Sequence, residues 1–393
     1  MKSIWLINYN FDNVTAGPTV RFMRYAPLFL AKGYRLTFVT HKSDPGLPDK
    51  EQREFYDILR VSNKLPFFKH SLFLFKSFWL AAFAPQKPGS IISIGITTFL
   101  LWVVPLLILK KVKIIYVNTM NLHLTYLNGN SVFVNMYNSV HRYLYKVLYS
   151  NINYVVSSSS TLSEGFKKLN VPDSKLKIIY NGVNSERFKP VNESEKRKYR
   201  QLLNLPLEGK IVLFVGLKVD RKGILDLIDS WKLIYKQHPD YHLVLVGDEK
   251  TSAGDPDYNA QWDSLKKEME NPELRIINRP NHPQIEEYFF SSDIFIFLSK
   301  KEGMPNVVLE AMSAGLPIIM TAFEGFSDDY GNNGEHYWLV ERNPEIISQA
   351  IVELNSNQDL YNTIQKKSLQ RVQDHFLVDA SIDKYIQLFE SKN

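Results

Sequence analysis

The chain has 393 residues, 45% of them hydrophobic and 22% charged, a composition that indicates a folded protein and excludes intrinsic disorder. Because one hydrophobic core rarely serves so long a chain, two domains are expected. The absence of cysteine excludes disulfide bonds, a thiolate nucleophile and a Cys-ligated zinc site.

The charges are distributed unevenly along the chain. Residues 1–190 contain 24 Lys and Arg against 9 Asp and Glu, a net charge of +15, whereas residues 191–393 contain 23 against 32, a net charge of −9. A basic half indicates an anionic partner, either a nucleic acid or a membrane surface. Because the acidic half argues against wrapping a nucleic acid, an anionic membrane surface is the expected partner and no nucleic acid is expected.

The first half of the chain alternates strand and helix patterns. A short strand over Ser3–Asn8 precedes an apolar-periodic helix over Val20–Ala31, and a second strand follows over Tyr34–Thr40. Helical patterns separate three further β-rich runs, which are Ser90–Ile94, Lys113–Asn118 and Tyr154–Ser158. This alternation predicts a mostly parallel, doubly wound sheet covered by helices.

Two apolar segments of this half bear on membrane contact. Thr97–Leu109 has 13 residues with an internal Pro105 and is too short to span a bilayer. Leu65–Ala84 is rich in Phe and Trp and carries Lys69 and Lys76 on one helical face. This second segment is either an interfacial helix on a membrane or a core helix packed on the sheet.

The start of the chain indicates its location. Only the short apolar run Ile4–Ile7 follows the first three residues, so the apolar core of a signal peptide is missing. A cytoplasmic protein is therefore expected, and the basic first half places it peripherally on the inner face of the membrane.

The regular pattern breaks between Asn181 and Pro190. We therefore place the first domain at residues 1–190, the second at 191–375, and a C-terminal helix at 376–393 that packs back toward the first domain. The second domain repeats the α/β alternation, with strands predicted at Lys210–Val215, Tyr241–Val246, Leu274–Ile277, Ile294–Leu298 and Leu316–Thr321.

The most informative segment, Ser299–Gly315, follows one of these predicted strands. Gly303 permits a tight turn, Pro305 suits the start of a helix and Gly315 suits its end. A helix N-terminus at the carboxyl end of a parallel strand presents free amides and a positive dipole to a phosphate. The segment therefore predicts a strand, a turn and a short helix that can bind an anion.

Two carboxylates lie in this segment, Glu302 before the helix and Glu310 within it. A carboxylate can accept two hydrogen bonds from a vicinal diol, so the pair could hold two different diols. Taken alone, Glu302 could merely cap the helix, and Glu310 could lie on a solvated face. The apolar neighbours of Glu310 argue for a specific partner, because a charge among them needs one.

A second cluster of charge lies at Arg221 and Lys222, directly before the helical run Ile224–Tyr235. The macrodipole disfavours cations at a helix N-terminus by roughly 0.3 to 1 kcal/mol each. Either both side chains extend into solvent, or Lys222 faces an anion shared with the helix, such as a diphosphate.

The motifs taken together resemble one family. Gly216, then Lys222-Gly223, then Glu302-Gly303 with Glu310 after seven intervening residues, then Gly315-Leu316-Pro317, are similar to the family-4 retaining glycosyltransferases. The resemblance implies an α/β protein of the GT-B fold, with two Rossmann-like doubly wound domains facing across a cleft. It covers most of residues 150–393 and only the outline of residues 1–150.

The resemblance also implies roles for individual residues. Lys222 would bind the donor diphosphate, Glu302 the donor sugar and Glu310 the ribose, with catalytic roles for Lys222 and Glu302. The full implied donor-binding set is Gly216, Arg221, Lys222, Glu302, Gly303, Met304, Pro305, Asn306, Val307 and Glu310. The implied acceptor or cleft set is Gly17, Asn118, Thr119 and His123.

The chain departs from the family pattern in three places, the first being the N-terminal loop, in which Gly17 beside Pro18 is the only glycine. The family carries an arginine directly after the strand-ending glycine, where this chain has Leu217, so Lys218 or Arg221 would supply the missing contact. The family histidine after the strand Lys113–Val117 has no obvious match, and His123 is the candidate substitute.

The resemblance implies transfer of a hexose-type sugar from a nucleotide-diphosphate donor to a glycan or lipid-linked acceptor in cell-surface polysaccharide or glycoconjugate synthesis. A UDP-sugar is favoured over a GDP-sugar. The sequence has neither the G-x-G-x-x-G fingerprint of NAD-binding proteins nor the P-loop of ATP-binding proteins. No motif requires a metal either, so no cofactor is expected. Two alternatives are a nucleotide-sugar epimerase of the same fold and a degenerate transferase that acts as a membrane-associated binding partner.

Overall fold

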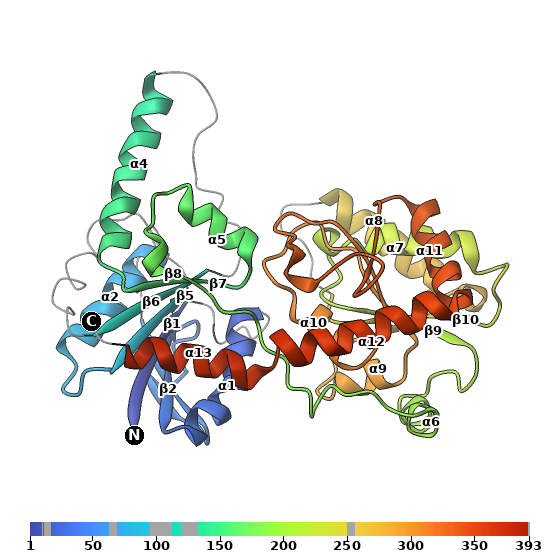
Figure 1. Ribbon diagram of the computed structural model, residues 1–393, viewed down its shortest axis with the longest axis horizontal. Coiled ribbons are helices and arrows are strands. Elements are labelled where there is room, and N and C mark those ends of the chain that lie inside the picture. Colours follow the sequence, from blue (N-terminus) through green and yellow to red (C-terminus); the bar gives the residue numbers. More distant parts are fainter. Residues whose placement is uncertain are drawn as a thin grey trace. The chain divides into compact units, whose positions relative to one another are not determined.

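A computed structural model describes residues 1–9, 11, 17–62, 69–94, 112–118, 132–249 and 256–391 of the chain (Figure 1). The chain divides into two compact units. Unit 1 contains Met1–Asn181 and Val378–Asn393, and unit 2 contains Gly182–Leu377. Each unit is built on one sheet with helices packed against it.

The sheet of unit 1 has eight strands in the order β3-β4-β2-β1-β5-β6-β7-β8, and every neighbouring pair is parallel except β3 with β4. The strands are β1 Lys2–Asn8, β2 Tyr34–His41, β3 Lys50–Gln52, β4 Tyr56–Val61, β5 Ser90–Ile94, β6 Lys113–Asn118, β7 Tyr154–Ser157 and β8 Leu176–Ile178. The five strands predicted from the sequence of this half are confirmed, within one residue at each end. The mostly parallel, doubly wound sheet that was expected is therefore present.

Alternate strand residues of unit 1 form two separate cores, one on each face of the sheet. Ile92 and Ile115 belong to one core and Ile91 and Ile114 to the other, as the period of two in a strand requires. The helices on the first face are α1 (Gly17–Ala31) and α13 (Val378–Glu390). Those on the second are α2 (Lys69–Phe83), α4 (Val132–Ser150) and α5 (Ser160–Lys167).

The two apolar segments singled out in the sequence have different outcomes. Thr97–Leu109 lies outside the described residues. The other segment contains α2, which buries Phe73, Leu74 and Phe78 against the sheet, as the core-helix alternative requires. Among the described residues, no helix is both long enough and apolar enough to cross a membrane.

The sheet of unit 2 has six strands, all parallel, in the order β11-β10-β9-β12-β13-β14. The strands are β9 Lys210–Val215, β10 Tyr241–Val246, β11 Ile276–Arg279, β12 Ile294–Phe297, β13 Ile318–Thr321 and β14 Trp338–Val340. The helices are α6 Glu193–Leu202, α7 Ile224–Ile234, α8 Pro256–Met269, α9 Glu286–Phe290, α10 Asn306–Ser313, α11 Pro344–Ser356 and α12 Gln358–His375.

The direction of winding in unit 2 reverses at β9. The chain runs outward from β9 through β10 to β11, then returns to the other side of β9 as β12 and continues to β13 and β14. In open parallel sheets of this kind, ligands bind at the carboxyl ends of the strands where the order reverses. The loops that follow β9 and β12 are therefore the expected location of a site.

The chain passes from unit 1 to unit 2 after Asn181, instead of near residue 190. The residues that follow Asn181 in the chain make contacts with unit 2. The Val183 amide donates to the Phe376 carbonyl at 2.8 Å, and the Phe188 ring packs edge-on against Phe289 with 5.5 Å between centroids. Residues 182–190 thus belong to unit 2.

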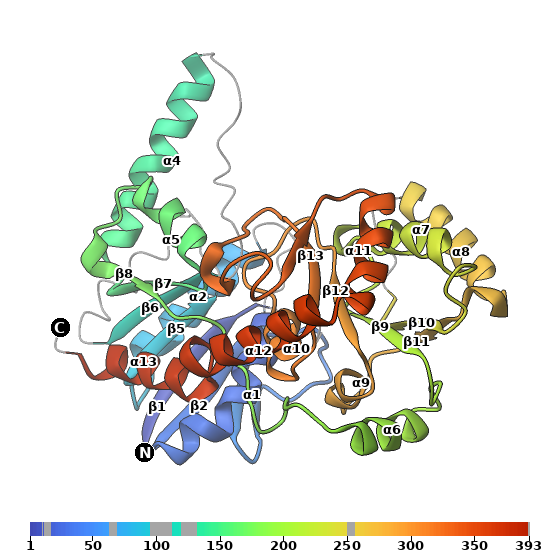
Figure 2. The same ribbon diagram turned by 45° about the vertical axis from the view of Figure 1, so that its right-hand side comes forward.

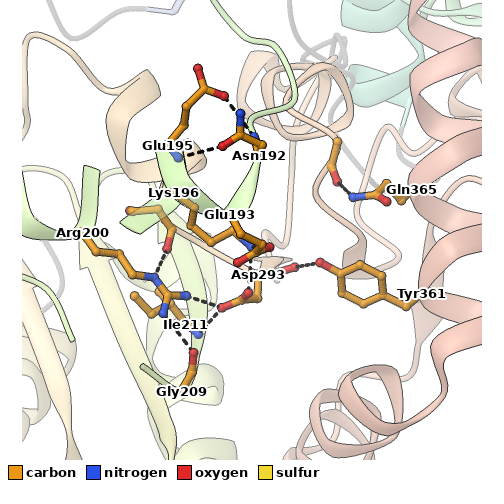
Figure 3. Close-up of polar contacts among 12 residues, drawn as sticks. Asn192, Glu193, Glu195, Lys196, Arg200, Gly209, Ile211, Asp293, Tyr361 and Gln365 are labelled. Atoms are coloured by element: carbon orange, nitrogen blue, oxygen red, sulfur yellow. Dashed lines mark hydrogen bonds and ion pairs between the residues drawn. The ribbon is translucent and has the colours of Figure 1, made fainter. Parts of the chain in front are cut away.

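A buried polar network fixes α6 to the sheet of unit 2 (Figure 3). The guanidinium of Arg200 donates to the Asp293 carboxylate at 2.7 Å and to the backbone carbonyls of Ser291, Leu207 and Gly209. The same carboxylate accepts the Ile211 amide of β9 at 2.8 Å. One side chain therefore ties the start of β12 to α6 and to β9.

Candidate functional site

The candidate site of unit 2 lies where its winding reverses. Lys222 ends the short 3-10 helix Asp220–Lys222 that follows β9, and Glu302 lies in the loop that follows β12. The two strands are neighbours in the sheet, so residues 80 positions apart in the sequence meet at one edge. This is the strand, turn and helix setting that the sequence predicts for an anion site.

One oxygen of Glu302 accepts three hydrogen bonds. The donors to Oε1 are Lys222 Nζ at 2.7 Å, Arg221 Nη1 at 2.6 Å and Ser299 Oγ at 2.7 Å. A carboxylate that merely capped a helix would instead accept backbone amides. The structure therefore places the predicted sugar-binding carboxylate in direct contact with both predicted diphosphate-binding cations.

The charges of this cluster are partly removed from water. The side chains of Lys222 and Glu302 are 14% and 15% exposed, against 40% for Arg221. Burial lowers the pKa of Lys222 even though the Glu302 carboxylate opposes the change. Burial acts to raise the pKa of Glu302, but the Lys222 and Arg221 charges and the hydrogen bonds outweigh it, and the net shift is downward. Glu302 is thus held as the carboxylate.

Two glycines allow the loops of the site to approach each other closely. Gly223 has φ +69°, and a Cβ there would lie 2.1 Å from the Leu298 carbonyl oxygen at the end of β12. Gly325 has φ +96°, and a Cβ there would lie 2.1 Å from the Glu302 carbonyl oxygen. Any side chain at either position would push the Lys222 or Glu302 backbone out of place.

The helix α10 begins directly after the Glu302 loop. Pro305 is its N-cap residue, and no side chain caps this end of the helix. Asn306 and Val307 form its first turn and are partly buried, while Gly303 and Met304 are buried in the preceding turn. Gly315 adopts φ +74° just past the end, as predicted.

Glu310 lies in the second turn of α10 and is 5% exposed. The alternative that places it on a solvated face is therefore wrong. A buried carboxylate between buried Leu309 and Ala311 agrees with the argument that this charge serves a specific partner.

The two candidate substitutes for the family arginine, Lys218 and Arg221, lie in different surroundings. Arg221 contacts Glu302 within the site. Lys218 is 2% exposed, and its Nζ donates to the Arg279 carbonyl at the end of β11 at 2.7 Å. A Cβ added to Gly216, the strand-ending glycine, would lie 3.9 Å from the Lys222 side chain. Arg221 is therefore the candidate that reaches the proposed donor cluster.

The buried Lys218 predicts a pH dependence of stability. Burial lowers its pKa from 10.5 to about 8, against the opposing charges of Glu249 and Asp248. Between these values the unfolded chain holds a proton that the folded chain has lost, so this group makes the fold more stable as pH rises, by at most about 1.4 kcal/mol per pH unit. Urea unfolding at pH 8, 9 and 10 should show a steeper rise for the native chain than for Lys218→Met. Parallel curves for the two proteins would contradict the assignment.

The predicted acceptor residues lie in unit 1 where they are described. Gly17 starts α1, and Asn118 is buried at the carboxyl end of β6. Thr119 and His123 lie outside the described residues. Within the part of the chain that the structure describes, no three Asp, Glu or His side chains converge as a metal site would require.

Two residues of the site were not found by sequence reasoning. Ser299 donates to Glu302, and its position directly after a predicted strand was the only available signal. Arg342 donates to the Ser299 carbonyl at 2.9 Å, to Thr321 Oγ1 at 2.9 Å and to the Asp226 carboxylate at 3.0 Å. It braces the end of β12 against α7, and nothing near it in the sequence indicates this role.

Two family models match the chain. Residues 16–187 match the model described as Glycosyltransferase Family 4, and residues 195–371 match the model described as Glycosyl transferases group 1. The two matches fall one in each half of the chain and together leave only short segments uncovered.

Two of the curated relatives that the chain resembles are named as glycosyltransferases. The capsular polysaccharide biosynthesis glycosyltransferase CapM of Staphylococcus aureus is 29% identical over 199 residues, 50% of this chain and 49% of CapM. The UDP-Gal:alpha-D-GlcNAc-diphosphoundecaprenol alpha-1,3-galactosyltransferase of Escherichia coli is 29% identical over 227 residues, 57% of this chain and 56% of that protein. The chain thus matches about half the length of these relatives.

Among solved structures, Anabaena Alr3699/HepE in complex with UDP and glucose matches over 100% of both chains, with a TM-score of 0.73 at 15% sequence identity. This similarity confirms the expected GT-B fold, with its two parallel-sheet α/β domains. From the two family matches and this fold, the chain belongs to the family-4, group 1 glycosyltransferases.

Proposed function

We propose that the protein transfers a hexose-type sugar from a nucleotide-diphosphate donor bound by unit 2 to an acceptor bound by unit 1. The observation that carries this proposal is the Glu302 cluster, in which Lys222 Nζ and Arg221 Nη1 lie within 2.7 Å of one carboxylate oxygen. The uncapped N-terminus of α10 follows the same loop and supplies amides for a phosphate.

Donor binding in this proposal exchanges the partners of Glu302. The diphosphate draws Lys222 and Arg221 away, because it carries more charge than one carboxylate and meets both cations. Glu302 is then released to accept the hydroxyls of the donor sugar, while Glu310 accepts those of the ribose. The ion pair of the free protein thus holds both groups close to their places in the donor complex.

The chemistry then requires no nucleophile from the protein. The bond between the anomeric carbon and the diphosphate oxygen breaks as the acceptor hydroxyl oxygen bonds to that carbon on the same face, which retains the configuration. The acceptor proton passes to the departing diphosphate. Lys222 and the α10 amides stabilise the negative charge that develops on the diphosphate, and positioning of the two substrates supplies the rest.

Names of similar proteins support a UDP-sugar as the donor and a glycan or lipid-linked acceptor. The relative from Escherichia coli is named for UDP-Gal and a diphosphoundecaprenol-linked sugar, and the Anabaena structure contains UDP and glucose. CapM is named for capsular polysaccharide biosynthesis. We extend these classes to this chain as a proposal, with synthesis of a cell-surface polysaccharide or glycoconjugate as its setting.

The proposal predicts selective stabilisation by one nucleotide. In a thermal-shift series with UDP, GDP and ADP and their sugars, the ligands of one base should raise the unfolding midpoint. At 100 times its Kd, such a ligand adds about 2.7 kcal/mol to the free energy of unfolding. UDP is the expected base. The stabilising sugar nucleotide is then incubated with and without acceptor glycans. Failure of every nucleotide to stabilise the protein would remove the proposal.

The two alternatives give different results in the same experiment. An epimerase would interconvert nucleotide sugars without an acceptor, whereas a transferase would release free nucleotide only slowly until an acceptor is present. A degenerate transferase would bind no donor, or bind it without turnover under any acceptor.

A further inference from the structure

A long segment of unit 1 contains no acidic residue. Between Asp57 and Glu164 the chain has 106 residues with ten Lys and Arg and no Asp or Glu, although a segment of this length would contain about 11 at the overall frequency of 41 in 393. The segment includes all of α2 and α4, so these two helices carry only positive formal charges. The formal charges that these two helices contribute to the surface therefore attract anions.

The helix α4 exposes a row of large apolar side chains. Phe133, Met136, Val140 and Tyr143 are between 52% and 79% exposed. Their spacing of three, four and three residues places them on one face of the helix. A soluble surface rarely maintains such a row in water, so this face is expected to be covered by a partner.

The C-terminal end of α4 is anchored in unit 1. Tyr149 is buried in the core beneath the helix, with its ring 5.6 Å from that of Phe166. Lys175 Nζ donates to the carbonyls of Tyr149, Ser150 and Ile152 and so fixes the end of the helix. The N-terminal part of α4 projects away from the sheet of unit 1 (Figure 2).

The helix α2 adds exposed apolar side chains on the same side of the sheet. Trp79, Leu80 and Phe83 are between 41% and 60% exposed, and α2 and α4 both pack into the same core. Of the thirteen exposed large hydrophobic residues in the described part of the chain, seven lie on these two helices. The apolar and basic features therefore coincide on one side of unit 1.

We propose that this side of unit 1 docks on a bilayer that contains anionic lipids, with the α4 row inserted at the boundary between head groups and acyl chains. Apolar insertion and charge attraction together are the two contributions that hold interfacial helices on membranes. The proposal does not depend on the proposed sugar transfer, because vesicle binding can be measured without substrates.

A second copy of this chain is a less suitable partner for the α4 row than an anionic bilayer. Paired helices bring the residues that flank their apolar seam together, and stable pairs place opposite charges there. The charged residues of α4 are Arg142 and Lys146, with no acid to pair with either. Two copies would therefore repel each other, whereas an anionic bilayer would attract both residues.

The absence of cysteine in the chain allows a direct test. Met136→Cys and Val140→Cys variants each carry one thiol for an environment-sensitive fluorophore, and Asn135→Cys, exposed on another face of α4, is the matched control. Adding vesicles of phosphatidylcholine with phosphatidylglycerol should shift the emission of the first two labels to the blue and leave the control unchanged. Vesicles of phosphatidylcholine alone should give little shift.

Sedimentation with the same vesicles measures the contribution of the row to binding. Val140→Glu should lower the partition coefficient at least about tenfold, whereas Asn135→Glu, which adds the same charge to the same helix, should lower it by less than about threefold. Circular dichroism of both variants checks that the fold persists. Equal loss in both variants, equal binding to neutral vesicles, or a blue shift that appears without vesicles as protein concentration rises would each overturn the proposal.

Discussion

Lys222→Ala will lower the rate of sugar transfer by about 100- to 1000-fold while unit 2 keeps its fold. In the free protein the Lys222 ammonium lies 2.7 Å from Glu302 Oε1 and is largely buried, so an anion that replaces this carboxylate meets an almost unhydrated cation. The charge on a departing diphosphate grows as the sugar bond breaks. Removal of the lysine should therefore lower mainly kcat, because the interaction of Lys222 with the diphosphate strengthens in the transition state.

The fold should survive this change because Glu302 keeps two of its three donors. Arg221 Nη1 and Ser299 Oγ still reach Oε1 after the lysine is removed, so no buried carboxylate is left without a partner. The thermal midpoint without nucleotide should thus move little. The midpoint shift caused by the cognate nucleotide diphosphate should shrink, since its phosphates lose one of two cations.

Lys300→Ala is the matched control for this experiment. Lys300 belongs to the same loop as Glu302 but pairs with Asp220 at 2.7 Å, and both of those side chains are about 40% exposed. Removing it deletes the same charge a short distance away and should change turnover by less than about threefold. Equal losses in the two variants would show that the general positive field matters, and not the contact of Lys222. Undiminished turnover in Lys222→Ala would remove its catalytic role.

The sequence predicted the parts of this site that depend on local chemistry. Gly303, Pro305 and Gly315 each have a backbone preference that a reader can apply without a fold, and they correctly delimit α10. The meeting of Lys222 with Glu302 is different, because it depends on β9 and β12 being neighbours. Periodicity does not specify strand order, so only the family resemblance placed these two residues in one site.

Elements were missed where the local signal is weak or misleading. The strands β8 and β14 have three residues each, too few to show a period of two. The strand β11 begins two residues later than predicted because Arg275 adopts φ +50°, a left-handed conformation that is uncommon outside glycine. Arg342 was missed for a third reason, since its partners on three other elements come together only in the folded unit.

Asp293→Ala will destabilise unit 2 by about 3 to 5 kcal/mol, the cost of leaving buried charge without its partner. The carboxylate is 8% exposed and accepts from Arg200, from Lys196 and from the Ile211 amide (Figure 3). After the change, one nitrogen of a buried guanidinium and one amide of the sheet lose their acceptor at the same time. Hydrogen exchange in urea should show the loss as faster opening of the amides in β9 and β12.

Glu208→Ala provides the comparison that isolates burial. It breaks the Arg197–Glu208 pair of 2.6 Å, which joins the same helix α6 to the same loop before β9, but the two side chains are 55% and 79% exposed. An exposed pair contributes about 0 to 1 kcal/mol, so this variant should unfold close to the native chain. Similar losses in the two variants would contradict the argument, because the pairs differ mainly in their access to water. A large loss confined to Asp293→Ala would instead show that this carboxylate secures the strand order on which the Lys222 and Glu302 site depends.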